Sequence, residues 1–392
     1  MEPRPEERRG AMKVLHLVSN WKVTGPVEPV IHLVKALRDR GIDARLAAGQ
    51  GPSGGPSFLA RRAAEIGVDV IEAWRLPKHL TNLVAHRRDI LAVRRFIDAE
   101  RIDVVHCHML NDHHIGGKAA RGARRPPPVL RSIYEAGKVK ASIRNRFVLP
   151  RLTDGIIAFS EASLAANRAA FRLAPERAWK LDGLVDLARF ETRRAPAQCR
   201  RRFDLPPQAF VLGIVTRIQA RRRFDLILEA VRQARRGTGN LIFMVVGRGT
   251  HVRAVLERPA RALGIADIVR HVGYLTGEDY VDALGAMDAK IFLGGGTDET
   301  ARAVREALAA GVPVIAGDAG MLPDLVRDGA TGLVTPLEAG ALAGAILRLA
   351  HNPRLRHSLA AQARADARAR FGADAQARAV TAIYRTLCPR RP

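Results

Sequence analysis

Residues 288–318 read DAKIFLGGGTDETARAVREALAAGVPVIAGD, and this stretch decides the fold. A short apolar strand runs into three glycines, a helix begins among polar and acidic residues, and residues 311–313, Gly-Val-Pro, end that helix before a second apolar strand. This order predicts a βαβ unit with a polar loop at the carboxyl end of its first strand. Ligands bind at this edge of open parallel sheets, because glycines let the loop backbone approach a ligand closely and the amino terminus of a helix favours anions.

The same alternation of apolar strands and amphipathic helices runs through the rest of the chain. Strands are expected at 13–18, 44–48, 68–71, 103–107, 129–133, 155–159 and 179–181, and again at 210–215, 241–246, 268–272 and 332–335. Helices are expected at 28–40, 58–66, 82–100, 141–152, 224–235 and 252–263, and the last fifty residues read as helical. The sequence therefore predicts an α/β protein with two tandem doubly wound parallel sheets of the Rossmann-like type.

A chain of 392 residues is too long for one ordinary core, which indicates two domains. The polar, arginine-rich and proline-containing stretch after Leu181 reads as a linker. The predicted organisation is a disordered lead at 1–11, a first domain at 12–185, a linker at 186–207, a second domain at 208–370, and a C-terminal helix at 371–392 with the option of returning to the first domain.

Composition excludes several classes of protein. No apolar run reaches the roughly 18 residues that span a bilayer, and the charged first eleven residues lack the apolar core of a signal peptide. Cys107, Cys199 and Cys388 match no metal or redox spacing, which favours a reducing compartment. We therefore expect a cytoplasmic protein.

The formal net charge of +25 calls for an anionic partner: nucleic acid, membrane phospholipid or a phosphorylated substrate. Only nine of the 64 basic residues are lysine, and an arginine and alanine bias of this kind also follows from a GC-rich genome. Aromatic residues make up only 5% of the chain, so the interleaved basic and aromatic pattern of single-strand binders is missing. No specific nucleic acid is expected.

Two weaker motifs have more ordinary explanations. Gly247 and Gly249 follow a strand like half of a dinucleotide fingerprint, but Val252 occupies the third glycine position, so a tight strand-to-helix turn is favoured over a nicotinamide cofactor. The densest group of metal-ligand types consists of His106, His108, Asp112, His113 and His114. Its spacing departs from that of metallohydrolases, and we expect histidines lining a cleft rather than a metal site.

Basic residues also cluster where the first strand of the second half ends. Arg217 follows this strand, and Arg221, Arg222 and Arg223 lie on the loop to the next helix. Two guanidinium groups about five residues apart can hold a diphosphate from two sides, whereas the alternative is a solvated run of charges.

In their order along the chain, several sequence motifs resemble those of the retaining glycosyltransferases of the two-domain GT-B fold, specifically family 4. The matching phrases are residues 14–25, 103–106, 153–161, 182–186 with 189–190, 216–225, 246–249 and 298–314. The resemblance implies a nucleotide-sugar donor held mainly by the second domain, an acceptor held mainly by the first, and chemistry in the cleft between them. It also implies that no metal or other cofactor is needed, because fixed cations and helix termini stabilise the leaving group.

The resemblance also assigns roles residue by residue. Glu306 would hold the donor ribose, Arg217 and Arg222 would neutralise the departing diphosphate, and Asp298 would contact the sugar. The further donor-binding residues it implies are Gly25, Gly247, Gly249, Gly296, Thr297, Glu299, Thr300, Ala301 and Arg302, and the acceptor side would include His106 and Tyr134.

Three positions depart from the family pattern. The usual pair of glutamates is Asp298 and Glu306 here, Tyr134 stands where many members have a histidine, and Pro26 interrupts the first glycine-bearing loop. The donor sugar and the acceptor are therefore left open.

We expect transfer of a sugar to a glycan or lipid-linked acceptor of the cell envelope. The alternatives are a nucleotide-sugar epimerase or hydrolase of the same fold and a non-catalytic sugar-nucleotide binder. The basic helix at 138–151 could rest on anionic lipid at the inner face of the membrane, although a solvated helix face explains it equally well.

Overall fold

The computed structural model describes residues 11–23, 27–51, 55–77, 83–135, 139, 143–191, 194–294 and 298–389. The chain divides into two compact units, which are treated separately below. Unit 1 comprises Met1–Leu184 together with Ala373–Pro392, and unit 2 comprises Val185–Gly372. Each unit is built on one parallel sheet, of seven strands in unit 1 and six in unit 2, which confirms the predicted fold class.

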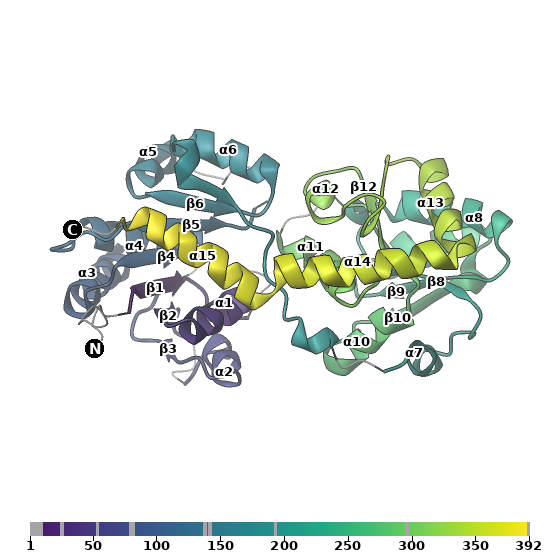
Figure 1. Cartoon of the computed structure of the whole chain (residues 1–392), viewed down its shortest axis with the longest axis horizontal. Helices are drawn as coiled ribbons and strands as arrows, with labels where there is room; N and C mark the ends of the chain where they lie inside the picture. Colours follow the sequence, from purple (N-terminus) through teal and green to yellow (C-terminus); the bar gives the residue numbers. More distant parts are fainter. Residues whose placement is uncertain are drawn as a thin grey trace, which may run out of the picture. The chain divides into compact units, whose positions relative to one another are not determined.

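Unit 1 has the strand order β3-β2-β1-β4-β5-β6-β7 (Figure 1). Its strands are β1 (Lys13–Val18), β2 (Asp43–Ala48), β3 (Val70–Ile71), β4 (Val104–Cys107), β5 (Val129–Ile133), β6 (Gly155–Ala158) and β7 (Ala178–Lys180). Its helices are α1 (Val27–Asp39), α2 (Phe58–Ala64), α3 (Leu83–Glu100), α4 (Leu110–Arg121), α5 (Ile143–Arg151), α6 (Glu161–Phe171) and α15 (Ala373–Leu387). The direction of winding reverses between β1 and β4, the topological switch point of the sheet.

The two faces of this sheet carry different side chains. On one face, Leu15, Leu17 and Val105 form a core with residues of α3 and α4 such as Val93 and Ile115. On the other face, α1 and the C-terminal helix α15 pack together, and α15 lies across the strands (Figure 1). The last helix of the chain is therefore part of the unit that contains the first strand.

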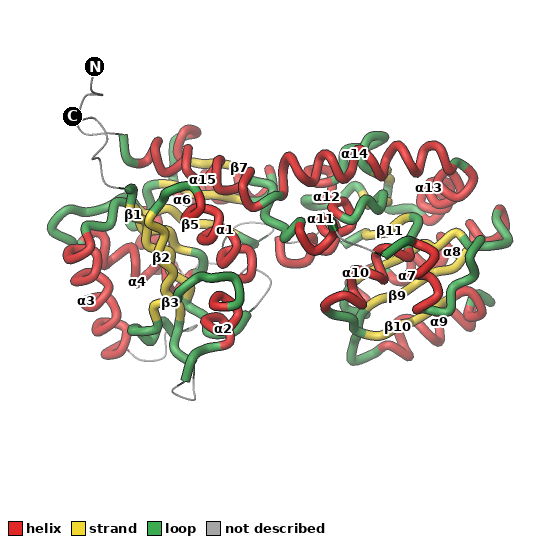
Figure 2. The backbone as a smooth tube through the Cα atoms, turned by 60° about the horizontal axis from the view of Figure 1, so that its bottom comes forward, coloured by secondary structure: helices red, strands yellow, loops and turns green. Residues whose placement is uncertain are grey.

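Unit 2 repeats the pattern with the order β10-β9-β8-β11-β12-β13, and its switch point lies between β8 and β11 (Figure 2). Its strands are β8 (Phe210–Val215), β9 (Leu241–Val246), β10 (Val269–Gly273), β11 (Ala289–Phe292), β12 (Val314–Gly317) and β13 (Gly332–Thr335). Its helices are α7 (Pro196–Arg202), α8 (Phe224–Gly237), α9 (Arg258–Ala262), α10 (Gly277–Ala286), α11 (Asp298–Ala309), α12 (Leu322–Leu325), α13 (Ala339–His351) and α14 (Pro353–Phe371).

Several local features differ from the expectations. The stretch 186–207 contains the turn Ala188–Phe190 and the helix α7, which packs on α10 within unit 2. The helix expected at 252–263 is a π-helical segment, Arg253–Glu257, followed by α9. Pro259 explains this break, because proline lacks the N–H that an α-helix needs at that position.

Within the described residues, no helix is both long and apolar enough to cross a membrane.

Candidate active site

The carboxyl ends of β8 and β11 lie side by side at the switch point of unit 2, because these two strands pair directly. The loop after β8 carries Arg217 and Arg222, and the loop after β11 leads into α11. This edge is where open parallel sheets bind ligands. The structure therefore places the basic loop and the acidic helix, which lie far apart in sequence, at one edge.

Glu306 is the most constrained carboxylate at this edge. It lies on α11 and is only 6% exposed. The Tyr280 hydroxyl donates to its Oε2 at 2.5 Å, Arg302 Nε donates to its Oε1 at 3.0 Å, and Arg189 Nη1 lies 3.8 Å from Oε1. Burial, with the Glu306 charge second, holds the pKa of Tyr280 well above its usual value, so Tyr280 remains a donor. Groups on α10, on α11 and on the turn Ala188–Phe190 together fix the carboxylate.

Lys290 lies beneath the same helix. Its side chain projects from β11, is fully buried, and donates to the carbonyl of Ala303 on α11. Burial lowers its pKa from 10.5 to about 7, and the opposing attraction of Glu306 is the smaller effect. The helix that carries Glu306 is thus tied to the sheet by an amine that is partly neutral at physiological pH.

Arg222 is held close to the end of β11. Its guanidinium carbon lies 5.9 Å from the centre of the Phe292 ring, and a Cβ on Gly294 would come within 3.2 Å of its Nη1. Gly294 thus leaves room for the guanidinium beside the first loop residue. A bulkier residue there would displace Arg222.

Gly247 and Gly249 fix the backbone on either side of Arg217. A Cβ on Gly247 would lie 1.9 Å from the Thr216 carbonyl oxygen, and one on Gly249 would lie 2.1 Å from the Ile218 carbonyl oxygen. The amides of Thr216 and Ile218 donate to the neighbouring loop at 3.0 Å. The glycines are therefore required by packing between two loops, which leaves the exposed Arg217 in a fixed position.

Some expected donor-binding residues are placed only in part. Gly25, Gly296 and Thr297 lie outside the described residues. Asp298 is the first residue of α11 and is followed by Glu299 and Thr300; for these three only the helical backbone is described, whereas Ala301 is fully buried. Backbone amides at the start of a helix lack intrahelical partners, so residues 298–301 offer donors to an anion.

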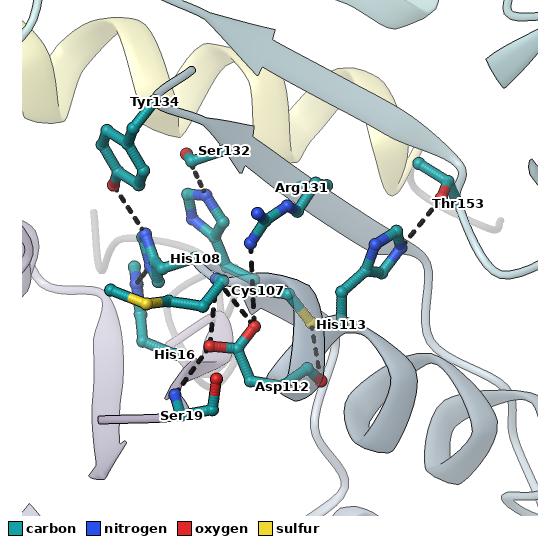
Figure 3. Close-up of polar contacts among 12 residues, drawn as sticks. His16, Ser19, Cys107, His108, Asp112, His113, Arg131, Ser132, Tyr134 and Thr153 are labelled. Carbon is teal, nitrogen blue, oxygen red and sulfur yellow. Dashed lines mark hydrogen bonds and ion pairs between the residues drawn. The ribbon is translucent and has the colours of Figure 1, made fainter. Parts of the chain in front are cut away.

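At the switch point of unit 1, six buried or half-buried groups form one continuous chain of hydrogen bonds. Figure 3 shows the members of this chain other than Tyr384. Its members are, in order, Tyr134, His108, His16, Tyr384, His106 and Ser132, with successive separations of 2.9, 3.0, 3.2, 2.7 and 2.8 Å. His16 and His106 are register partners on β1 and β4, so their side chains share a face, and α15 supplies Tyr384. Tyr134 is the half-exposed end of the chain, and His106 lies fully buried behind it.

His16, His106 and His108 are the group in the described part of the chain whose ring nitrogens come close enough to suggest a metal, all within 4.8 Å of one another. Burial lowers the pKa of each, that of His16 to about 3, so the three rings are neutral. The five hydrogen bonds above use all six ring nitrogens, which leaves none of them for coordination in this arrangement. The chain of hydrogen bonds therefore accounts for the close approach of the three histidines without a metal.

The other members of the expected histidine cluster lie elsewhere. His113 Nε2 is 2.9 Å from Thr153 Oγ1, and Asp112 accepts from the amides of Ser19 at 2.8 Å and Met109 at 2.9 Å (Figure 3). Arg131 Nη1 lies 3.8 Å from Asp112, and both side chains are buried. Burial raises the pKa of Asp112 to about 7, although Arg131 and the amides oppose this shift. Asp112 thus joins the end of β1 to the start of α4.

Reasoning from sequence did not find His16, Tyr384, Tyr280, Arg189, Lys290 or Arg131 as parts of these clusters. Tyr280 is 26 residues from Glu306, and Tyr384 is 278 residues from His106. A signal existed for His16, because it lies near the carboxyl end of its strand as His106 does in β4, and strands one and four are neighbours in a doubly wound sheet.

Two Rossmann-like units, each with a polar switch point, define the GT-B class of glycosyltransferase. Residues 24–189 match the family described as Glycosyltransferase Family 4, and residues 198–366 match Glycosyl transferases group 1. A D-inositol 3-phosphate glycosyltransferase of Actinosynnema mirum is 30% identical over 304 residues, covering 72% of this chain and 72% of that protein. The chain therefore belongs to glycosyltransferase family 4, the group 1 glycosyl transferases, and it is a glycosyltransferase enzyme.

Solved structures agree on the fold. HepE of Anabaena, in complex with UDP and glucose, has a TM-score of 0.72 at 21% identity and covers 95% of this chain and 99% of its own. A glycosyltransferase from Rickettsia africae has a TM-score of 0.78 at 16% identity, covering 97% of this chain and 100% of its own. At these identities the likeness shows the GT-B fold alone.

Proposed function

We propose that this glycosyltransferase transfers a sugar from a nucleoside-diphosphate donor to an acceptor hydroxyl with retention of configuration, in the synthesis of a cell-envelope glycan or glycolipid. The observation that carries the proposal is the carboxylate of Glu306, fixed by Tyr280, Arg302 and Arg189 at the switch-point edge of unit 2. A fixed carboxylate suits the vicinal diol of a ribose, because a carboxylate has about four acceptor sites and a diol donates two hydrogen bonds.

The cations at the same edge suit the diphosphate. Arg222 lies against the end of β11 and Arg217 follows β8, which is the neighbouring strand. In the transfer, the bond between the anomeric carbon and the diphosphate oxygen breaks, and a bond to the acceptor oxygen forms. The acceptor proton leaves on the departing phosphate, and the two guanidinium groups stabilise the negative charge that develops there.

The relatives narrow the choice of substrates to be tested. The HepE structures contain UDP, and one contains UDP-glucose, so UDP-sugars are the first donors to test. The relatives from Actinosynnema mirum and Catenulispora acidiphila are D-inositol 3-phosphate glycosyltransferases, which makes a small phosphorylated polyol a second candidate acceptor beside a lipid-linked glycan. In unit 1 the half-exposed Tyr134, with the hydrogen-bond chain behind it, is our proposed acceptor-side contact.

Calorimetric titration of nucleoside, nucleoside diphosphate and nucleotide sugar tests the donor site. We expect Glu306→Gln to weaken all three about tenfold to a hundredfold, because the ribose is common to them. Arg222→Ala should weaken only the two ligands that contain a diphosphate. Glu257→Gln is the matched control, since Glu257 is an exposed glutamate of the same unit. Wild-type affinity in both Glu306→Gln and Arg222→Ala would remove the proposed donor site.

The reaction itself is tested by release of nucleotide from the bound donor. We expect release to depend on an acceptor, either D-inositol 3-phosphate or a lipid-linked envelope glycan. The anomeric configuration of the product, read by NMR, should match that of the donor. Inversion of configuration would contradict the proposed stereochemistry while leaving the donor site intact.

A further inference from the structure

Helix α3 of unit 1 has an exposed face that mixes large aliphatic side chains with arginines. Leu83, Val84 and Leu91 are 67%, 62% and 49% exposed, which makes them three of the few large apolar side chains that the described surface exposes. The remaining members of the face are Arg87, Arg88, Arg94 and Arg95, all exposed. We call these seven residues the α3 face.

The seven side chains are arranged in order around the helix. At about 100° per residue they fall within about 140° of arc, with Leu91 near the middle. Arg87 and Arg94 flank it on one side, and Arg88 and Arg95 flank it on the other. Ala85, His86, Val93 and Ile97 are buried against the rest of unit 1, so the opposite side of the helix provides its packing.

The described residues do not neutralise the positive charge of this face. No ion pair joins its four arginines to a carboxylate among the residues that the structure describes. The acidic residues of α3 are engaged elsewhere: Asp89 accepts from the amides of Arg75 and Leu76, Asp98 accepts from the amide of Arg124, and Glu100 pairs with Arg45. The α3 face is therefore both cationic and apolar.

We propose that the α3 face docks on the surface of an anionic phospholipid bilayer, with α3 lying parallel to it. Arginines on both flanks reach phosphate groups while their stems and the central Leu91 enter the interfacial layer, which is how amphipathic helices bind membranes. A second copy of the chain is a poorer occupant, because a symmetric contact would bring like charges together. Nucleic acid is also poorer, since the three exposed aliphatic side chains of the face do not contribute to phosphate contacts.

This inference does not depend on which sugar or acceptor the enzyme uses. The proposal concerns α3 and not the basic helix at 138–151, which the sequence suggests as a lipid contact. The side chains of residues 140–146 in that helix lie outside those described, so they carry no part of this inference.

Flotation of the full-length protein with vesicles tests the proposal. We expect binding to phosphatidylcholine vesicles that contain about 30% phosphatidylglycerol, little binding to phosphatidylcholine alone, and weaker binding as salt rises. Arg87→Ala combined with Arg88→Ala should lower the partition coefficient about thirtyfold, which is about fivefold for each arginine. Leu91→Ser should lower it about fivefold through the lost apolar contact.

The matched control is Arg168→Ala combined with Arg172→Ala. Arg168 lies on α6 and Arg172 is the residue that caps its carboxyl end; both are exposed and belong to the same unit. Helix α6 lies away from α3 (Figures 1 and 2). We expect this control to bind vesicles like the wild type. Unchanged midpoints of urea unfolding, followed by tryptophan fluorescence, would show that each variant is folded.

Three results would overturn the proposal: no flotation at low salt, equal loss in the control and in the α3 variant, or full binding by Leu91→Ser. Binding of duplex DNA that depends on Arg87 and Arg88, without vesicle binding, would instead assign the face to nucleic acid. Flotation that is lost in both the α3 arginine variant and Leu91→Ser but kept in the control would support it.

Discussion

The two switch points share one strand order but differ in chemistry. In unit 1 the edge is built from neutral imidazoles and hydroxyls, and Tyr384 of α15 joins His16 to His106. In unit 2 the edge is built from ions, and Glu306 is surrounded by Arg302, Arg189 and the hydroxyl of Tyr280. One topology therefore supports two kinds of site, because different side chains from strands, helices and turns meet at the two switch points.

The difference follows from burial together with pairing, since Glu306 is also buried but has two arginines beside it. The histidine rings of unit 1 are fully buried, and the desolvation free energy of a charged imidazole there exceeds the stabilisation that neighbouring groups provide. The rings therefore remain neutral and form hydrogen bonds with one another and with the hydroxyls. Arg217 lies exposed beyond the end of β8 in unit 2, where solvent supports its charge. The contrast suits an uncharged, hydroxyl-bearing acceptor group in one unit and an anionic donor in the other.

The largest expected effect is acid sensitivity confined to unit 1. Burial lowers the pKa of His16, His106, His108 and His113 in the folded state, so that state binds fewer protons than the unfolded chain below about pH 6.5. Stability should therefore fall as pH falls, by about 2 kcal/mol for each histidine at pH 5. Asp112, whose folded pKa is raised to about 7, opposes this trend as a single group.

All three tryptophans, Trp21, Trp74 and Trp179, lie in unit 1, so their fluorescence reports this unit alone. The urea midpoint by fluorescence should fall between about pH 7.5 and pH 5. The described histidines of unit 2 are exposed, and the calorimetric transition assigned to that unit should move much less. Equal shifts in both transitions would contradict the contrast.

Arg131→Met should give the next largest effect. It removes the buried partner of Asp112 and leaves a carboxylate that must either stay charged without compensation or take up a proton. We expect unit 1 to lose about 3–5 kcal/mol, measured by urea unfolding with fluorescence. Arg302→Met is the counterpart in unit 2, and because Arg302 is partly exposed it should cost less than about 1 kcal/mol of stability. Comparable losses in the two variants would show that the two edges do not differ in burial cost.

Lys290→Met tests the buried amine of unit 2. The pKa of Lys290 is about 7 in the folded state and 10.5 in the reference state, so the folded protein binds fewer protons between these values and stability rises with pH. Methionine removes this penalty, and we expect unit 2 to gain about 2–3 kcal/mol at pH 7 and to lose the rise toward pH 10. The fluorescence transition of unit 1 serves as the control. A steeper pH dependence in the variant would contradict the prediction.

The sequence predicted the sheets well because nearly every strand is a short apolar run between turn residues. It did not predict α4 or α10 as helices. The residues of α4, LNDHHIGGKAAR, include two histidines and two glycines in place of a periodic apolar stripe. Both helices form because tertiary packing overrides a weak local helix preference. In α4, for example, Gly116 packs so closely against Leu17 of β1 that a Cβ at this position would clash with it.

The candidate site divides in the same way. Glu306 and Arg222 could be predicted from sequence because each lies within a continuous motif that follows a strand. Tyr280 and Arg189 were not found, because their only relation to Glu306 is spatial. The sequence around His16 predicts only an apolar strand, and the role of His16 depends on the pairing of β1 with β4 and on the return of α15 to unit 1.

The smallest effect is expected from Tyr280→Phe, which removes one hydrogen bond to Glu306 Oε2 and leaves the rest of the edge in place. If Tyr280 positions the carboxylate for a ribose diol, the dissociation constant for a nucleoside diphosphate should rise about tenfold. A 2′,3′-dideoxy analogue should lose no affinity, since it has no diol to be positioned. The reciprocal variant, Tyr384→Phe, removes hydrogen bonds to His16 and His106, so it should destabilise unit 1 by about 1–2 kcal/mol without changing donor affinity. Equal losses for the ribose and dideoxy ligands in Tyr280→Phe would assign Tyr280 a purely structural role, and the two edges would then differ in charge but not in function.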